Sequence, residues 1–153
     1  LFDYKFHKKH DGVMRVSYHH VEISAFMKAK AIELLGYIAN APKEHKIAFL
    51  KAFFDDEGSV RFKKKRREVR GYQHSPERLL LIQNLLTDFG IESTIDKQQV
   101  EITISRRENL LKFQKLINFS EGISINPDRP NSMWKRALQK REILQMALAS
   151  YQT

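Results

Sequence analysis

The chain of 153 residues contains no cysteine, which excludes disulfides and thiolate metal sites and fits an intracellular location. It also has no apolar run near the roughly 18 residues that a membrane-spanning helix needs, so we expect no membrane partner. Neither GxGxxG nor GxxxxGK[ST] occurs in it, and nucleotide-cofactor chemistry therefore has no support. The function has to be sought among other residue types.

Basic residues, in contrast, are abundant and clustered. The chain has 27 Lys and Arg against 18 Asp and Glu, a net charge of +9. Seven basic residues fall within positions 61–70, together with one acid, Glu68. A need for solubility explains a few surplus charges but does not explain such a cluster. Clustering on one element is typical of nucleic-acid binding, which would place the protein in the cytoplasm or with the nucleoid.

The basic cluster lies in a segment with the period of a β-hairpin, residues 59–74. Val60, Phe62 and Val69 would face a core, and the alternate positions would face outward. An outward face of Arg, Lys, Tyr and His suits phosphate contacts and the reading of base edges. The predicted DNA-binding residues are Arg61, Lys63, Lys65, Arg67, Arg70, Tyr72 and His74.

An apolar helix over 43–55 precedes this hairpin and ends in acidic residues. Its apolar residues lie nearly all round, so we expect it to be buried on most sides. Asp55, Asp56 and Glu57 follow, and Gly58 is placed to stop the helix. Carboxylates at that end oppose the helix dipole, whereas they suit a hard divalent cation. The triplet is either a metal site or a solvated helix end.

The remaining pattern predicts an α+β fold in two parts. Residues 41–153 would form a domain of order αββαββα, with a helix 76–89, a hairpin 92–105, a capping box Ser105–Glu108 opening a helix to 117, and a last helix over 133–150. Residues 1–40 read as a ββα segment, a possible tail of a preceding half-domain. The start at Leu1 rather than Met leads us to expect a fragment of a longer protein.

The segment Leu50-Lys-Ala-Phe-Phe-Asp-Asp-Glu-Gly58 resembles, without a gap, the nine-letter motif of the LAGLIDADG homing endonucleases. The wider stretch 48–60 resembles the form common in archaeal and intein-associated members. The order αββαββα from residue 43 is similar to the family domain, so the resemblance covers more than two thirds of the chain. It implies an antiparallel saddle-shaped sheet lying in the major groove of DNA.

The resemblance also implies an active site shared by two motif helices. These helices pack side by side about a pseudo-twofold axis, and an acid from each half reaches the scissile phosphates. Here the metal-binding acid falls on Glu57, which would hold Mg²⁺ or another divalent cation. Asp55 is usually structural in the family. The residues implied at the dimer or half-domain interface are Ala48, Ala52, Phe53 and Asp55.

Three further catalytic positions follow from the same resemblance. His74 falls where relatives place a polar group that orders water, and Arg78 falls where a basic residue neighbours the site. A lysine near the start of the last helix often assists catalysis. Lys135, Arg136 and Lys140 are candidates for it, and we include Lys140 in the predicted catalytic set.

The departures from the family pattern leave two readings open. Glu57 replaces the usual aspartate, and Lys51 and Ala52 replace a small Ala-Gly pair. Only one motif is present, so cleavage of both DNA strands would require a homodimer or a missing partner half. The alternative is a catalytically silent nucleic-acid-binding protein of the same fold, either an RNA-splicing maturase or a DNA-binding regulator. The presence of Glu57 favours the enzyme.

Overall fold

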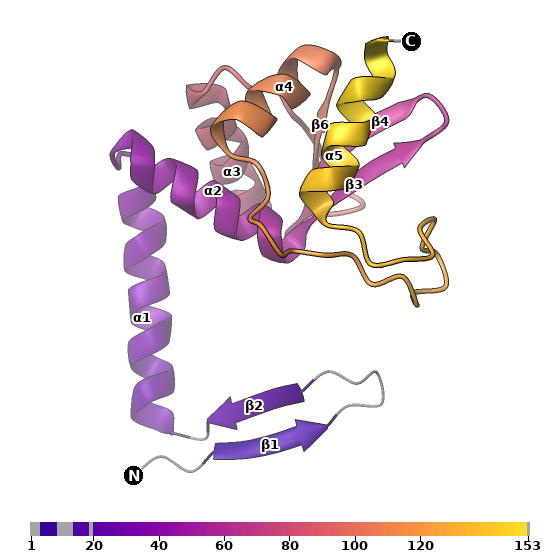
Figure 1. Ribbon diagram of the computed structural model, residues 1–153. Coiled ribbons are helices and arrows are strands. Elements are labelled where there is room, and N and C mark those ends of the chain that lie inside the picture. The colour runs from indigo at the N-terminus through magenta and orange to yellow at the C-terminus, as the bar shows by residue number, and fades with distance from the viewer. Residues whose placement is uncertain (1–3, 9–13, 19, 153) are drawn as a thin grey trace. The chain divides into compact units, whose positions relative to one another are not determined.

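The computed structural model describes residues 4–8, 14–18 and 20–152, and it places the side chains of residues 20–151. The chain forms two compact units, Leu1–Asn40 and Ala41–Thr153. Figure 1 shows the elements of both units along the chain.

The first unit is a hairpin followed by a helix, in the predicted order ββα. Strands β1 (Tyr4–Lys8) and β2 (Met14–Tyr18) pair antiparallel. Helix α1 (Val21–Ile38) begins where the imidazole of His20 accepts a hydrogen bond from the backbone of Ile23, at 3.4 Å. The exposed large apolar side chains of α1 are Val21, Phe26, Met27, Ile32, Leu34 and Tyr37. No helix in the described residues has the length and hydropathy to cross a membrane.

The second unit confirms the predicted α+β fold. One antiparallel sheet of four strands, in the order β3-β4-β6-β5, packs against helices. The elements of this unit are α2 (Lys43–Glu57), β3 (Gly58–Lys63), β4 (Arg66–Tyr72), α3 (Pro76–Asp88), β5 (Thr94–Asp96), β6 (Glu101–Ser105), α4 (Arg107–Leu116), α5 (Lys140–Ala149) and a 3₁₀ turn, Ser150–Gln152.

The register of the strands fixes which side chains face the helices. Gly58 lies opposite Gly71, and Val60 lies opposite Val69, so these positions share one face. Val69, Ile102 and Ile104 on that face are fully buried. Helix α5 crosses in front of β3 and β4 in Figure 1 and makes contacts with both. The predicted inward positions of the hairpin are therefore confirmed.

The core beneath the sheet is built around aromatic rings from distant parts of the chain. Phe54 of α2 packs edge-on against Phe113 of α4, with centroids 4.9 Å apart, and Phe113 packs against Phe119 at 5.5 Å. All three rings are buried. The prediction that α2 is buried on most sides is wrong, because Ala48 and Ala52 on another face of the helix are exposed.

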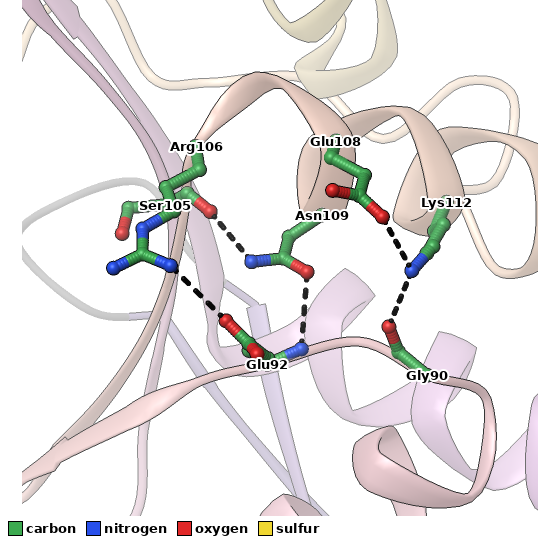
Figure 2. A network of polar contacts seen from close by, with 7 residues as sticks. All are labelled: Gly90, Glu92, Ser105, Arg106, Glu108, Asn109 and Lys112. Atoms are coloured by element: carbon green, nitrogen blue, oxygen red, sulfur yellow. Dashed lines mark hydrogen bonds and ion pairs between the residues drawn. The ribbon is translucent and has the colours of Figure 1, made fainter.

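The predicted capping box at Ser105 and Glu108 does not form. Helix α4 begins one residue later, and its N-cap, Arg106, has a positive φ of 69° and makes no side-chain cap. Asn109 holds this helix start instead (Figure 2). Its amide donates to the backbone carbonyl of Ser105 and accepts from the backbone N–H of Glu92, both at 3.1 Å. Asn109 is 6% exposed, so both bonds are shielded from water.

The last helix also begins later than predicted, at Lys140 rather than near 133. Gln139 before it is extended and bridges Ser124, because the Leu138 carbonyl accepts a hydrogen bond from the backbone of Ile125 and the Lys140 N–H donates one to the carbonyl of Ile123. A capping box between Gln139 and Glu142 then starts α5. Trp134, expected inside the helix, lies in the loop before it and is half-buried beside Phe62, with ring centroids 6.5 Å apart.

Candidate acidic site and open strand face

The acidic end of α2 runs directly into the sheet through Gly58. The backbone N–H of Gly58 donates to the carbonyl of Phe54, and φ is −87°, which is extended rather than left-handed. The glycine is needed for space instead, since a Cβ at this position would collide with the Phe54 carbonyl. Glu57 is therefore the last helical residue, placed where β3 begins.

Asp55 makes its contacts within the chain. Its carboxylate accepts a hydrogen bond from the backbone N–H of Ser120 at 2.8 Å, and its backbone carbonyl accepts one from the ammonium of Lys140 at 2.7 Å. These bonds agree with a structural role. Asp56 and Glu57 are exposed and make no hydrogen bond or ion pair with other described residues. Two acidic side chains at this end thus remain open to a ligand.

Lys140 is the basic residue that the fold brings to the acidic end. Burial lowers the pKa of its ammonium, while the nearby charges of Asp55, Asp56 and Glu57 act to raise it. Arg129 is close enough to lower the pKa a little further. The other two candidate bases, Lys135 and Arg136, are exposed in the loop before α5. The structure thus distinguishes Lys140 from the two alternatives by its contact with Asp55.

His74 and Arg78 lie near the same end of the sheet. Because Gly58 opposes Gly71, the chain that leaves β4 after Tyr72 emerges where α2 meets β3. The hydroxyl of Tyr72 is within 3.0–3.1 Å of the ring nitrogens of His74. Arg78 is exposed in the first turn of α3. In the described part of the chain, neither His74 nor Arg78 forms a hydrogen bond or ion pair with Glu57.

The carboxylates fit part of a metal site. Asp56 and Glu57 offer the oxygen ligands that Mg²⁺ prefers, and Mg²⁺ commonly takes one or two carboxylates and completes its shell with water and phosphate. Within the described residues, no group of three or more His, Cys, Asp or Glu side chains could hold a metal ion. Further ligands would have to come from a bound substrate, water or a second chain.

The sheet face opposite the helices forms the second candidate site, and we call it the open strand face. Cross-strand pairing arranges its side chains in four rows. The rows are Lys63–Arg66, Arg61–Glu68–Ser105, Ser59–Arg70–Thr103–Thr94 and Tyr72–Glu101–Asp96. All of these side chains are exposed or half-buried. The predicted outward positions Arg61, Lys63, Arg70 and Tyr72 all belong to this face.

Arg67 does not belong to it, which corrects the predicted set. It lies opposite Phe62, on the side of the sheet that the helices cover. Its guanidinium donates to the Ser150 hydroxyl at 2.5 Å and lies 4.5 Å from the ring centre of Tyr151. Lys65 is in the turn between β3 and β4 rather than on a strand, and His74 follows the end of β4. Arg67 therefore joins the hairpin to the end of α5.

The four predicted interface residues separate into two pairs. Ala48 and Ala52 are exposed one turn apart on α2. Phe53 instead packs within its own unit. It lies against Gly71 of β4, and its ring centroid is 4.9 Å from that of Phe54. Of the four predicted residues, Ala48 and Ala52 are thus the exposed pair, whereas Phe53 and Asp55 are half-buried.

Sequence reasoning missed the partners of several site residues. The alternation of apolar and polar residues in β6 puts Glu101 on the outward face, but it gives no sign that the carboxylate binds the Arg70 guanidinium at 2.9 Å. Glu68 likewise lies 3.6 Å from Arg61. The contact of Asp55 with Ser120 joins residues 65 positions apart. Such long-range partners have no local signal in a single sequence.

Comparisons with known proteins bear on the family and the fold. The model of the LAGLIDADG-like domain matches residues 44–118. Two curated relatives, from Thermococcus kodakarensis and Pyrococcus horikoshii, are both named probable translation initiation factor IF-2. They are 37% and 40% identical over 94 and 90 residues, or 61% and 58% of this chain. The matched segment is 8% of the length of each relative, so their names carry no functional argument.

Similar solved structures include the homing endonuclease I-DmoI. Its mesophilic variants align with a TM-score of 0.55 and 19% identity, over 78% of this chain and 60% of that one. I-DmoI in complex with DNA and Mn aligns with a TM-score of 0.54 and 18% identity, over 76% of this chain and 63% of that one. At such identities the likeness shows the fold. The motif, the matched domain and the fold agree, and residues 44–118 therefore form a LAGLIDADG-like domain.

Proposed function

We propose that this chain is a site-specific double-strand DNA endonuclease that depends on a divalent cation. The observation that carries the proposal is the acidic end of α2, where Asp56 and Glu57 are exposed and Lys140 is held beside them. The open strand face, with its basic hairpin, begins at the same junction. A cation-binding group next to a polyanion-binding surface is what phosphodiester cleavage requires.

The proposed roles follow from the positions of the side chains. Glu57, with Asp56 beside it, would hold Mg²⁺, which supplies activation of water and stabilisation of charge at phosphorus. Lys140 would place a positive charge next to the developing negative charge. His74, restrained by the Tyr72 hydroxyl, would orient water, and Arg78 would attract the phosphate backbone. The open strand face would fix the register of the duplex.

One acidic helix end can serve one DNA strand, so a second end has to come from outside residues 1–153. We propose that the exposed Ala48 and Ala52 form the contact, either in a homodimer or with a partner half. Small residues allow two helices to approach closely, as the implied family arrangement requires. The ββα unit, residues 1–40, would then be the tail of a preceding half-domain.

The function is tested by cleavage of a randomised duplex library in Mg²⁺. We expect the parent to cut selected sequences and Glu57→Gln to cut none, because the variant loses a metal-binding charge but keeps its shape. Glu44→Gln is a matched control, since Glu44 is exposed in the first turn of the same helix. It should cut like the parent. Activity that survives in Glu57→Gln would refute the assigned role of this acid.

The alternative function predicts a different result in the same assay. A maturase or regulator of this fold would bind nucleic acid, with no cleavage by the parent or by either variant. Solution mass measured at micromolar concentration separates the two assembly schemes. A dimer would support self-association through α2. A monomer that cleaves only one strand would indicate that a partner half is needed.

A further inference from the structure

The cations of the open strand face differ in their partners. Arg70 and Arg61 each face a carboxylate on the same surface, whereas Lys63 and Arg66 in the row nearest the turn form no ion pair among the described residues. The two halves of the hairpin therefore present different chemistry to a ligand. The turn end carries uncompensated charge, and the end nearest α2 carries arginine already paired with an acid.

The two arginine–carboxylate pairs also differ from each other. In the first, a terminal nitrogen of Arg70 donates to the Glu101 carboxylate at 2.9 Å, a full charge-assisted hydrogen bond. In the second, Arg61 is 3.6 Å from Glu68, which is too long for a hydrogen bond. Glu101 thus fixes the orientation of a guanidinium, and Glu68 supplies only a nearby charge.

Arg70 is held on the sheet more firmly than its neighbours. Its side chain is 25% exposed, and its Nε is buried with no hydrogen-bond partner in the described structure. The accessible part of the side chain therefore excludes Nε and lies toward the terminal nitrogens. Thr103 is directly opposite on β6, with Thr94 beyond it on β5, so short side chains flank the arginine. These short side chains leave room for a ligand to approach it.

We propose that Arg70 determines base preference at one position of the DNA site and that Glu101 is its positioning residue. A fixed guanidinium suits bidentate donation to O6 and N7 of a guanine in the major groove. The carboxylate also offsets the charge of Arg70, so this arginine adds little to general attraction for phosphate. Lys63 and Arg66 supply that attraction. The inference rests on the proposed binding of duplex DNA.

The experiment selects bound sequences from a randomised duplex library without a divalent cation, so that cleavage does not interfere. It compares the parent with Glu101→Ala, Glu68→Ala and Arg70→Lys. Both alanine variants remove one negative charge from the same face, but only the first removes the acceptor of a hydrogen bond from Arg70. The salt dependence of non-specific binding is measured in parallel, and thermal unfolding confirms that each variant is folded.

We expect one strongly preferred guanine in the parent selection. Glu101→Ala and Arg70→Lys should weaken that preference by about tenfold, the discrimination typical of one bidentate arginine contact. Glu68→Ala should keep the preference, although both alanine variants bind non-specific DNA more tightly and with a steeper salt dependence. A preference that survives in Glu101→Ala, or that is lost equally in Glu68→Ala, would overturn the inference. If the parent enriches no sequence at all, the proposed DNA recognition fails first and this inference with it.

Discussion

The ammonium of Lys140 donates a hydrogen bond to the backbone carbonyl of Asp55 across 2.7 Å, joining the first residue of α5 to the last turn of α2. The carboxylate of the same aspartate accepts from Ser120 in the loop between α4 and α5. Asp55 thus holds two separate segments against the end of the motif helix. The acids that follow it, Asp56 and Glu57, are left exposed.

This contact leads to a prediction about the pKa of Lys140. Burial lowers that pKa from the usual 10.5, and the three acids oppose the shift. Glu57→Gln should lower it further because one favourable charge is lost, and Arg129→Gln should raise it because a repulsive charge is lost. A titration of the lysine side chain followed by NMR measures both shifts. An unchanged pKa in both variants would contradict the assigned proximity.

The sign of the shift also predicts how stability varies with pH. Between the lowered pKa and 10.5, the folded chain has released the Lys140 proton while the unfolded chain retains it. The contribution of this group to the free energy of unfolding therefore rises with pH across that window. Lys140→Met should remove this rise in denaturant titrations carried out at several pH values. If the proposed chemistry uses the charged ammonium, activity should fall over the same window.

Asp55 is expected to matter for stability more than its acidic neighbour. Asp55→Ala removes the acceptor of the Ser120 backbone N–H and should lower the free energy of unfolding by about 1.5–3 kcal/mol, as for other hydrogen bonds to charged groups. Asp56→Ala, on the exposed side of the same turn, should change it by less than about 0.5 kcal/mol. Denaturant unfolding of both variants measures the difference. Equal losses would mean that the Ser120 contact contributes nothing specific.

Gly71 should be intolerant of a side chain because Phe53 packs against it. A Cβ on Gly71 would lie 2.5 Å from the Phe53 ring, so the ring would have to move. Gly71→Ala should cost about 1–3 kcal/mol of stability, the usual range for overpacking. In the background of Phe53→Ala the same change should cost less, with a coupling energy above about 0.5 kcal/mol. Strict additivity in this double-mutant cycle would contradict the packing.

Arg67 and Lys63 should respond to alanine substitution in opposite ways. Arg67→Ala breaks the bonds to Ser150 and the contact with the Tyr151 ring, so it should lower stability by about 1–2 kcal/mol. Lys63→Ala should leave stability within about 0.5 kcal/mol, because Lys63 is exposed. Under the proposed function, Lys63→Ala should also lower the salt slope of DNA binding by about 1, and Arg67→Ala should change it little. Denaturant unfolding and binding at several salt concentrations test the pair.

The order of elements and the faces of the hairpin β3–β4 could be predicted from sequence because they depend on local periods. Alternation with a period of two placed Val60 and Val69 inward, and it placed Arg61 and Arg70 outward. The boundaries were less accurate. Extended pairing of Leu138 with Ile125 delays α5 until Lys140, and that pairing joins segments whose separation leaves no local pattern.

The sequence by itself determined that an apolar helix ends in Asp55, Asp56 and Glu57, that a glycine follows, and that a basic hairpin comes next. These features are properties of neighbouring residues. Only the tertiary structure decided which basic residue lies beside the acidic helix end, which arginine binds other parts of its own unit, and which arginine is held by a carboxylate. Lys140, Arg67 and Arg70 received those separate roles from partners 85, 83 and 31 positions away. A charged side chain has the same local signature whether it is free, buried or paired, because its partner is set by strand register and helix packing.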